Sequence, residues 1–99
     1  MARFDVYANP DADGYLLDVQ ADLLSHLNTR IVVPLLAKSR APAAAATLNP
    51  VFDIQGQQFV MTTQFMAALP LTLLKMPLLN LESSHNEITR ALDFLFQGC

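Results

Sequence analysis

The segment that constrains this fold most is residues 9–14, Asn-Pro-Asp-Ala-Asp-Gly, because it combines four residue types that favour turns. It lies between residues 3–8, which alternate polar and apolar side chains, and the apolar-rich residues 15–19. Alternation with a period of two is typical of a β-strand with one buried face. Residues 3–19 therefore predict an antiparallel hairpin with an exposed loop.

Further strands are predicted downstream. Residues 31–36 are β-branched and apolar, as in a buried strand, and Pro34 marks an edge, a bulge or the strand's end because it has no N–H to donate. A second hairpin is predicted from residues 51–54 and 57–63 around the turn Gln55-Gly56. We expect residues 66–70 to be a connection and residues 71–74 a further strand.

Two segments predict little regular structure. Residues 21–28 predict a short helical turn that ends near Asn28. Residues 37–50 contain an alanine run, which favours a helix, between Pro42 and Pro50, which interrupt one. We expect this second segment to be an irregular arm with one helical turn.

The chain closes with one amphipathic helix. Ser84 followed by Glu87 matches a capping box, and Gly98 stands where a helix C′ glycine would. Phe94 lies off the apolar face and predicts a second buried side, against another subunit. The apolar face itself consists of Ile88, Ala91, Leu92, Leu95 and Phe96. Strands followed by one helix predict a mainly β, α+β fold, an antiparallel sheet or barrel with the helix packed on it, as a single domain over residues 1–99.

The apolar content predicts association. Of the 99 residues, 53% are hydrophobic and 15% are charged, and so small a domain cannot bury that much apolar surface within itself. A homodimer is the commonest solution. One cysteine forms no internal disulfide, no run reaches the roughly 18 apolar residues of a membrane span, and the first residues lack the apolar run of a secretory signal. We expect a cytoplasmic protein with no membrane partner.

The charge distribution disfavours direct contact with nucleic acid. The net charge is −3 and the six basic residues are scattered along the sequence. Nucleic-acid binding depends on clustered lysine and arginine side chains that displace counterions from phosphates. A protein or small-molecule partner is favoured.

No set of residues predicts catalysis. His26 and His85 have no second histidine or cysteine at metal-ligand spacing, so surface roles are favoured. Cys99 stands beside its own terminal carboxylate, which suppresses the thiolate. Asp18, between apolar strand residues, is either a catalytic acid or, as we favour, a structural hydrogen-bonded carboxylate. The three glycines are isolated and form no phosphate loop. We expect no enzymatic activity, no catalytic residue, no cofactor and no metal.

Several stretches, taken in order, resemble one family. They are FDVY, LLDVQADLL, LNTRIVVPL, MTTQFMAALPLTLL and HNEITRALDFLFQG, and they resemble the CcdB toxins of toxin–antitoxin modules. The resemblance runs from Phe4 to Gly98, is most specific at DVQADLL and RIVVPL, and is poorest at residues 37–50. It implies an SH3-like antiparallel barrel of the CcdB/MazF type with a small extra sheet and a C-terminal α-helix, assembled as a homodimer.

The resemblance also implies an activity and partners. A CcdB toxin binds the GyrA subunit of DNA gyrase and traps the cleaved DNA–gyrase complex without catalysing a reaction. A CcdA-like antitoxin neutralises the toxin and represses the operon together with it, so DNA is contacted only indirectly, through the antitoxin complex.

Two surfaces follow from the resemblance. The gyrase-binding residues would be Leu23, Leu24, Asp93, Phe96, Gln97, Gly98 and Cys99. The antitoxin-binding residues would be Asn9, Pro10, Asp11, Asp13 and Gly14, with parts of residues 37–50. The best-known family pattern ends in Trp-Gly-Ile, whereas this chain has Gln97, Gly98 and Cys99. The missing aromatic ring removes a cation–π contact worth about 1–2 kcal/mol.

Two other functions stay open. A MazF/Kid-type endoribonuclease shares the barrel and would need a positioned arginine and an acid, roles for which Arg30 and Asp18 are available. The third possibility is a non-toxic dimeric binding module whose apolar terminus is only an interface.

Overall fold

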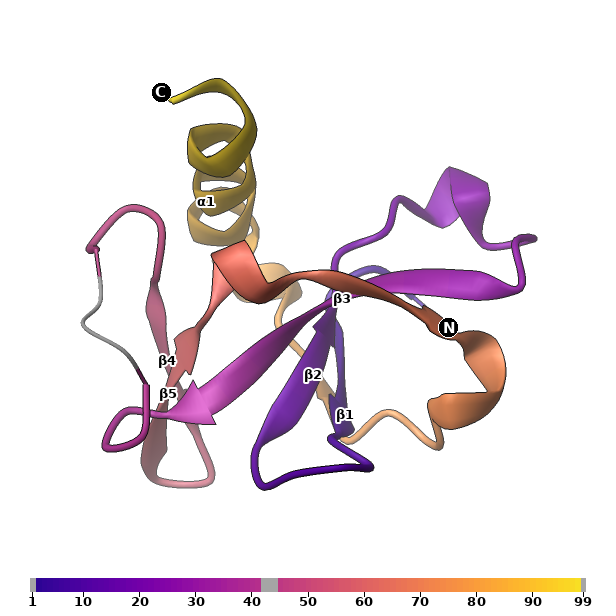
Figure 1. Cartoon of the computed structure of the whole chain (residues 1–99), viewed down its shortest axis with the longest axis horizontal. Helices are drawn as coiled ribbons and strands as arrows, with labels where there is room; N and C mark the ends of the chain where they lie inside the picture. The colour runs from indigo at the N-terminus through magenta and orange to yellow at the C-terminus, as the bar shows by residue number, and fades with distance from the viewer. Residues whose placement is uncertain (1, 42–44, 99) are drawn as a thin grey trace.

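The turn at residues 9–14 joins two strands in the computed structural model of the chain, which describes residues 2–41 and 45–98 (Figure 1). Strands β1 (Asp5–Ala8) and β2 (Tyr15–Asp18) are antiparallel, with Val6 opposite Leu17. Within the turn, the Asn9 side-chain oxygen accepts the Asp11 N–H at 3.0 Å, and the Asn9 N–H donates to the Gly14 carbonyl at 3.2 Å. The predicted first hairpin is confirmed, with its first strand beginning at Asp5.

The central strand is β3 (Thr29–Ala37), which has β2 along one side and two successive partners along the other. Its first half pairs with β6 (Ala67–Pro70), and its last residues pair with β5 (Gln57–Met61). Pro34 lies inside this strand, where the partner changes from β6 to β5, so its missing N–H breaks no ladder. Its carbonyl accepts the Thr62 N–H at 3.0 Å.

The seven strands of the described residues belong to one connected sheet. Its order is β4-β5-β3-β2-β1-β7, with β4 (Val51–Ile54) and β7 (Leu79–Asn80) at the ends and β6 branching from β3. The resemblance implies a small extra sheet, but these strands are all hydrogen-bonded into the same sheet. The protein is a mostly antiparallel half-barrel with one C-terminal helix, which confirms the predicted fold class.

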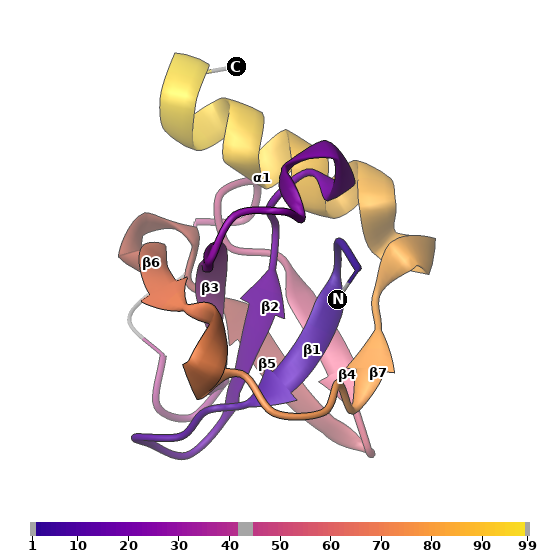
Figure 2. The same cartoon turned by 90° about the vertical axis from the view of Figure 1, so that its right-hand side faces the viewer.

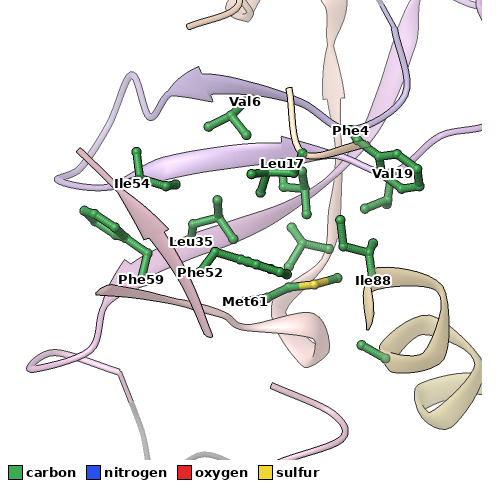
Figure 3. Packing of buried hydrophobic residues seen from close by; sticks show 13 residues of the cluster. Phe4, Val6, Leu17, Val19, Leu35, Phe52, Ile54, Phe59, Met61 and Ile88 are labelled. Carbon is green, nitrogen blue, oxygen red and sulfur yellow. The ribbon is translucent and has the colours of Figure 1, made fainter. Parts of the chain in front are cut away.

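The main core lies between the curved sheet and helix α1 (His85–Gln97) (Figure 3). The helix contributes Ile88 and Ala91, both fully buried, from its first two turns. The strands contribute Val6, Leu17, Val33, Leu35, Phe52, Ile54, Phe59 and Met61, while Phe4 directly precedes β1, Val19 directly follows β2 and Leu81 precedes the helix. The apolar positions that alternate along each strand therefore meet on one face of the sheet.

The other face of the sheet carries a smaller cluster. Tyr7, Leu16 and Val32 are buried there, covered by Leu74 and by the half-buried Leu69. This covering segment differs from its predicted structure. Residues 67–70 form strand β6 rather than a connection, and Leu71–Leu73 form the 3-10 helix η3 rather than a strand.

Of three further local predictions, the Ser84 cap is wrong and the other two agree with the described residues. Ser84 makes no side-chain cap; instead the 3-10 helix η4 (Glu82–Ser84) runs into α1, and the Asn80 side chain accepts the Glu82 N–H at 2.7 Å. Residues 21–28 contain the 3-10 helix η1 (Asp22–Leu24), as expected. The arm forms a turn in which the Asn49 N–H donates to the Ala45 carbonyl, while its residues 42–44 lie outside the described residues.

Candidate functional site

The C-terminal half of α1 projects away from the sheet (Figures 1 and 2). Phe96 is 70% exposed, so the prediction that it completes the buried apolar face of the helix is wrong. The apolar face of the helix runs on to Phe96, but Leu92 packs against the main core, Leu95 is half-buried and Phe96 is exposed. Phe94, expected to be buried against a second subunit, is partly exposed in the single chain.

The helix ends as its sequence predicts. Gly98 adopts a left-handed conformation with φ 76°, and its N–H donates to the Phe94 carbonyl at 2.9 Å. Asp93 and Gln97 are exposed on the last two turns. Four of the predicted gyrase-binding residues thus belong to one helix end, namely Asp93, Phe96, Gln97 and Gly98, and Cys99 lies outside the described residues.

The other predicted gyrase-binding residues lie on η1. Leu23 is 87% exposed, and Leu24 and the following Leu27 are also exposed. No residue of η1 is buried. Clustered exposed leucines on a surface loop mark a contact site more often than an isolated exposed leucine does.

The structure brings these two groups to the same end of the molecule but not together. Both project from the upper end in Figures 1 and 2, and Figure 1 shows that they are separated across it. The antitoxin-binding candidates of the 9–14 turn lie at the opposite, lower end in both views. A single chain therefore presents three distinct surfaces.

The 9–14 turn borders a shallow pocket of about 380 Å³. Its lining residues are Asp13, Gly14, Leu36, Ala37, Ser39, Arg40, Gln57 and Phe59. The Asp13 carboxylate and the Arg40 guanidinium form an ion pair of 3.0 Å at its edge, and both side chains are largely exposed. Such a pair stabilises little on its own and stays available to charged groups of a partner.

The predicted antitoxin-binding residues divide into two kinds. Pro10, Asp11 and Asp13 are exposed and free to contact a partner, and Asn9 is half-buried while holding the turn. Gly14 has φ 101°, and a Cβ added there would lie 2.5 Å from the Leu35 carbonyl oxygen. The structure therefore gives Gly14 a steric role within the fold.

A buried ion pair lies on the second face of the sheet. The Arg30 Nε donates to Asp18 Oδ2 at 2.8 Å and Nη2 lies 2.7 Å from the same oxygen, with both side chains 0% exposed. Asp18 Oδ1 accepts the Gln20 N–H at 3.0 Å. Asp18 is thus a hydrogen-bonded structural carboxylate, the role favoured from the sequence. The sequence does not predict that Arg30 is the ion-pair partner of Asp18, because Arg30 lies on another strand.

The environment of this pair shifts two pKa values. Burial raises the pKa of the Asp18 carboxyl, and the Gln20 N–H and the Arg30 guanidinium act in the opposite direction. Burial, together with the negative charges of Asp5 and Asp18, raises the pKa of Tyr7 to about 12. The Tyr7 hydroxyl and Arg30 Nη1 are buried without a hydrogen-bond partner among the described residues.

The two histidines occupy the surface, as the sequence predicts. His26 is exposed, and the partly exposed His85 packs edge-on against the Phe4 ring with centroids 5.3 Å apart. Within residues 2–41 and 45–98, no three His, Cys, Asp or Glu side chains gather closely enough to hold a metal ion. Across the same residues, no helix combines the length and apolarity needed to cross a membrane.

These features define a class: a small, mostly antiparallel half-barrel that exposes apolar side chains on a projecting helix end and on a surface loop. The family model for CcdB, described as CcdB protein, matches residues 3–98. The chain therefore belongs to the CcdB family and is a toxin of the CcdB type.

Proposed function

We propose that this protein poisons DNA gyrase by binding GyrA and trapping the cleaved DNA–gyrase complex. The observation that carries the proposal is Phe96, a large aromatic side chain 70% exposed on a helix end that projects from the body. An exposed phenylalanine contributes nothing to the core, and aromatic anchors of this kind dominate the binding energy of protein interfaces. Leu23 and Leu24 offer a second, separate apolar contact at the same end of the molecule.

The helix end suits this function because the last turn is ordered before binding. Gly98 closes the helix, so Phe96 and Gln97 are held in helical geometry rather than on a frayed tail. A preordered anchor loses less conformational entropy when it binds. Gln97 offers an amide to gyrase where the best-known family pattern offers an indole ring, so this contact is a hydrogen bond to a guanidinium rather than a stacked ring.

We further propose a CcdA-like antitoxin as the neutralising partner, bound at the exposed residues of the 9–14 turn and the adjoining pocket. The support is the exposed Asp13–Arg40 pair, which offers both signs of charge to a peptide. In this proposal toxin and antitoxin together repress their operon, and DNA contacts run through the complex.

We also propose that the protein acts without catalysis. A ribonuclease of the MazF/Kid type would need its arginine and acid at the surface, where RNA reaches them. Arg30 and Asp18 are 0% exposed and paired with one another, which counts against this alternative. The surface charge gives it no further support, since the basic residues are few and scattered.

Controlled expression in bacteria tests the proposal. Induction should stop growth in cells with wild-type gyrase and spare cells whose GyrA carries a change selected for resistance to CcdB-type toxins. Equal killing of both strains would sink the gyrase assignment. Purified protein should leave RNA intact, and cleavage would instead support the ribonuclease alternative.

A further inference from the structure

The loop of η1 is ordered although it has no core of its own. Asp22, Leu23 and Leu24 are all exposed, and Leu23 is 87% exposed. A 3-10 turn of three residues is too short to be stable by its own hydrogen bonds. Something outside the turn must therefore hold it.

The buried side chain of Gln20 supplies one tether. Its amide N–H donates to the Leu24 carbonyl at 2.9 Å, and its carbonyl oxygen accepts the Ile31 N–H of β3 at 3.1 Å. The two backbone partners are one acceptor and one donor, so they fix the orientation of the amide. Gln20 thus joins the end of η1 to the central strand.

Gln20 is itself fixed by the buried ion pair. Its backbone N–H donates to Asp18 Oδ1, while Asp18 Oδ2 is held by Arg30. The series Arg30, Asp18, Gln20 and Leu24 therefore runs without interruption from the second face of the sheet to the exposed loop.

Asp22 supplies a second tether at the start of η1. Its side-chain Oδ1 accepts the Arg3 N–H at 2.8 Å. Beyond the turn, the Leu71 N–H donates to the Asn28 carbonyl at 2.9 Å. The loop is thus held by polar contacts to three other segments of the chain, while its leucines stay free.

We propose that Gln20 and Asp22 are positioning residues that hold Leu23 and Leu24 in the conformation that binds gyrase. This inference rests on the proposed function. Neither residue needs to touch the partner, because each acts through the backbone of η1. The buried pair of Asp18 and Arg30 holds the Gln20 backbone in place and so fixes the position of its side chain. Prior ordering removes part of the entropy cost of binding.

The test compares three variants by amide exchange and by affinity for GyrA. Asp22→Ala removes the acceptor for Arg3, Asp22→Asn keeps an acceptor and removes only the charge, and Gln20→Met removes both amide bonds without adding a buried charge. Losing one such hydrogen bond should raise the amide exchange rate of the loop about tenfold and weaken the affinity for GyrA about tenfold. Asp22→Asn should resemble the wild type in both.

Protection of the Leu24, Ser25 and Leu27 amides should fall in Asp22→Ala and Gln20→Met, while protection of β1 and β2 stays unchanged. Because Asp22 is at the surface, Asp22→Ala remains informative even where Gln20→Met fails to fold. Unchanged loop protection in Asp22→Ala would overturn the proposal. Lowered loop protection with undiminished gyrase binding would also overturn it. Weak gyrase binding by Asp22→Asn with full loop protection would overturn it as well, because it would show that the Asp22 charge contacts gyrase directly.

Gyrase binding and loop ordering are measured separately. If the wild-type protein does not bind gyrase, both the proposed function and gyrase as the partner of Leu23 and Leu24 are contradicted. The exchange measurement needs no gyrase, so it separately decides whether these tethers order the loop.

Discussion

Two glycines with positive φ are constrained in different ways. Gly14 lies against β3, where a Cβ would meet the Leu35 carbonyl oxygen, whereas Gly56 in the β4–β5 turn has open space around it. The sequence identifies both as turn residues. It cannot reveal the close approach at Gly14, because Leu35 belongs to a strand that follows later in the chain.

Replacing each glycine by alanine should separate the two constraints. Gly14→Ala is expected to lower the free energy of unfolding by about 3 kcal/mol, from left-handed strain plus steric overlap. Gly56→Ala, the matched control, should cost about 1 kcal/mol from strain alone. Urea unfolding measures both, and equal losses would contradict the steric role of Gly14.

The raised pKa of Tyr7 predicts a loss of stability at alkaline pH. The pKa rises from 10.0 to about 12 on folding, so the folded state holds the phenolic proton more tightly than the unfolded state. The resulting stabilisation is complete below pH 10 and is lost as the pH rises through about 12, by about 2–3 kcal/mol in all.

Unfolding of the wild type and of Tyr7→Phe, compared across this pH range, measures the effect. The variant should lose less stability between pH 10 and 12, because it has no phenolic proton at this site. Parallel declines in the two proteins would show that Tyr7 is not the group responsible.

At the scale of elements, prediction succeeds where local pattern and tertiary pairing agree. The 9–14 turn, the strands on either side and the helix that ends at Gly98 all follow from neighbouring residues. The structure of residues 67–74 does not follow from neighbouring residues. The mostly exposed β6 has no alternating pattern and is a strand because it pairs with the long β3. The 3-10 helix η3 follows Pro70 where a strand was predicted, and the Leu71 N–H at its start donates to the Asn28 carbonyl. Contacts distant in sequence decide both.

The two halves of α1 should respond differently to truncation of their side chains. Ile88→Ala leaves a cavity in the core and is expected to cost about 3 kcal/mol of unfolding free energy. Phe96→Ala removes an exposed ring and should change stability by at most about 0.5 kcal/mol while abolishing growth arrest. Thermal unfolding and induction in cells measure the two effects. A folded Phe96→Ala that still arrests growth would contradict the role of Phe96.

At the scale of the whole molecule, the candidate surfaces occupy opposite ends. The predicted gyrase-binding residues lie in two separate groups at the end from which α1 and η1 project, and the 9–14 turn lies at the other end. The resemblance assigns these residues to their partners but gives no arrangement. In the single chain the helix end and η1 lie apart at this end of the molecule (Figure 1).

The exposed apolar side chains also bear on assembly. The homodimer expected from the sequence, which we also propose, predicts a sedimentation mass about twice 10.9 kDa. Phe94→Ser should shift the protein toward the monomer, because this partly exposed ring is expected to pack against the second subunit. A monomeric wild type at micromolar concentration would contradict the dimer.

We expect the projecting helix end to trap gyrase on cleaved DNA, and a cleavage assay tests this most directly. Purified protein, gyrase and supercoiled DNA are incubated with ATP, and the covalent complex of GyrA with DNA is counted after denaturation. The wild type should accumulate this complex, while Phe96→Ala, folded to the same extent, should not. Absence of the complex at saturating wild-type protein, or equal amounts with both proteins, would contradict the claim.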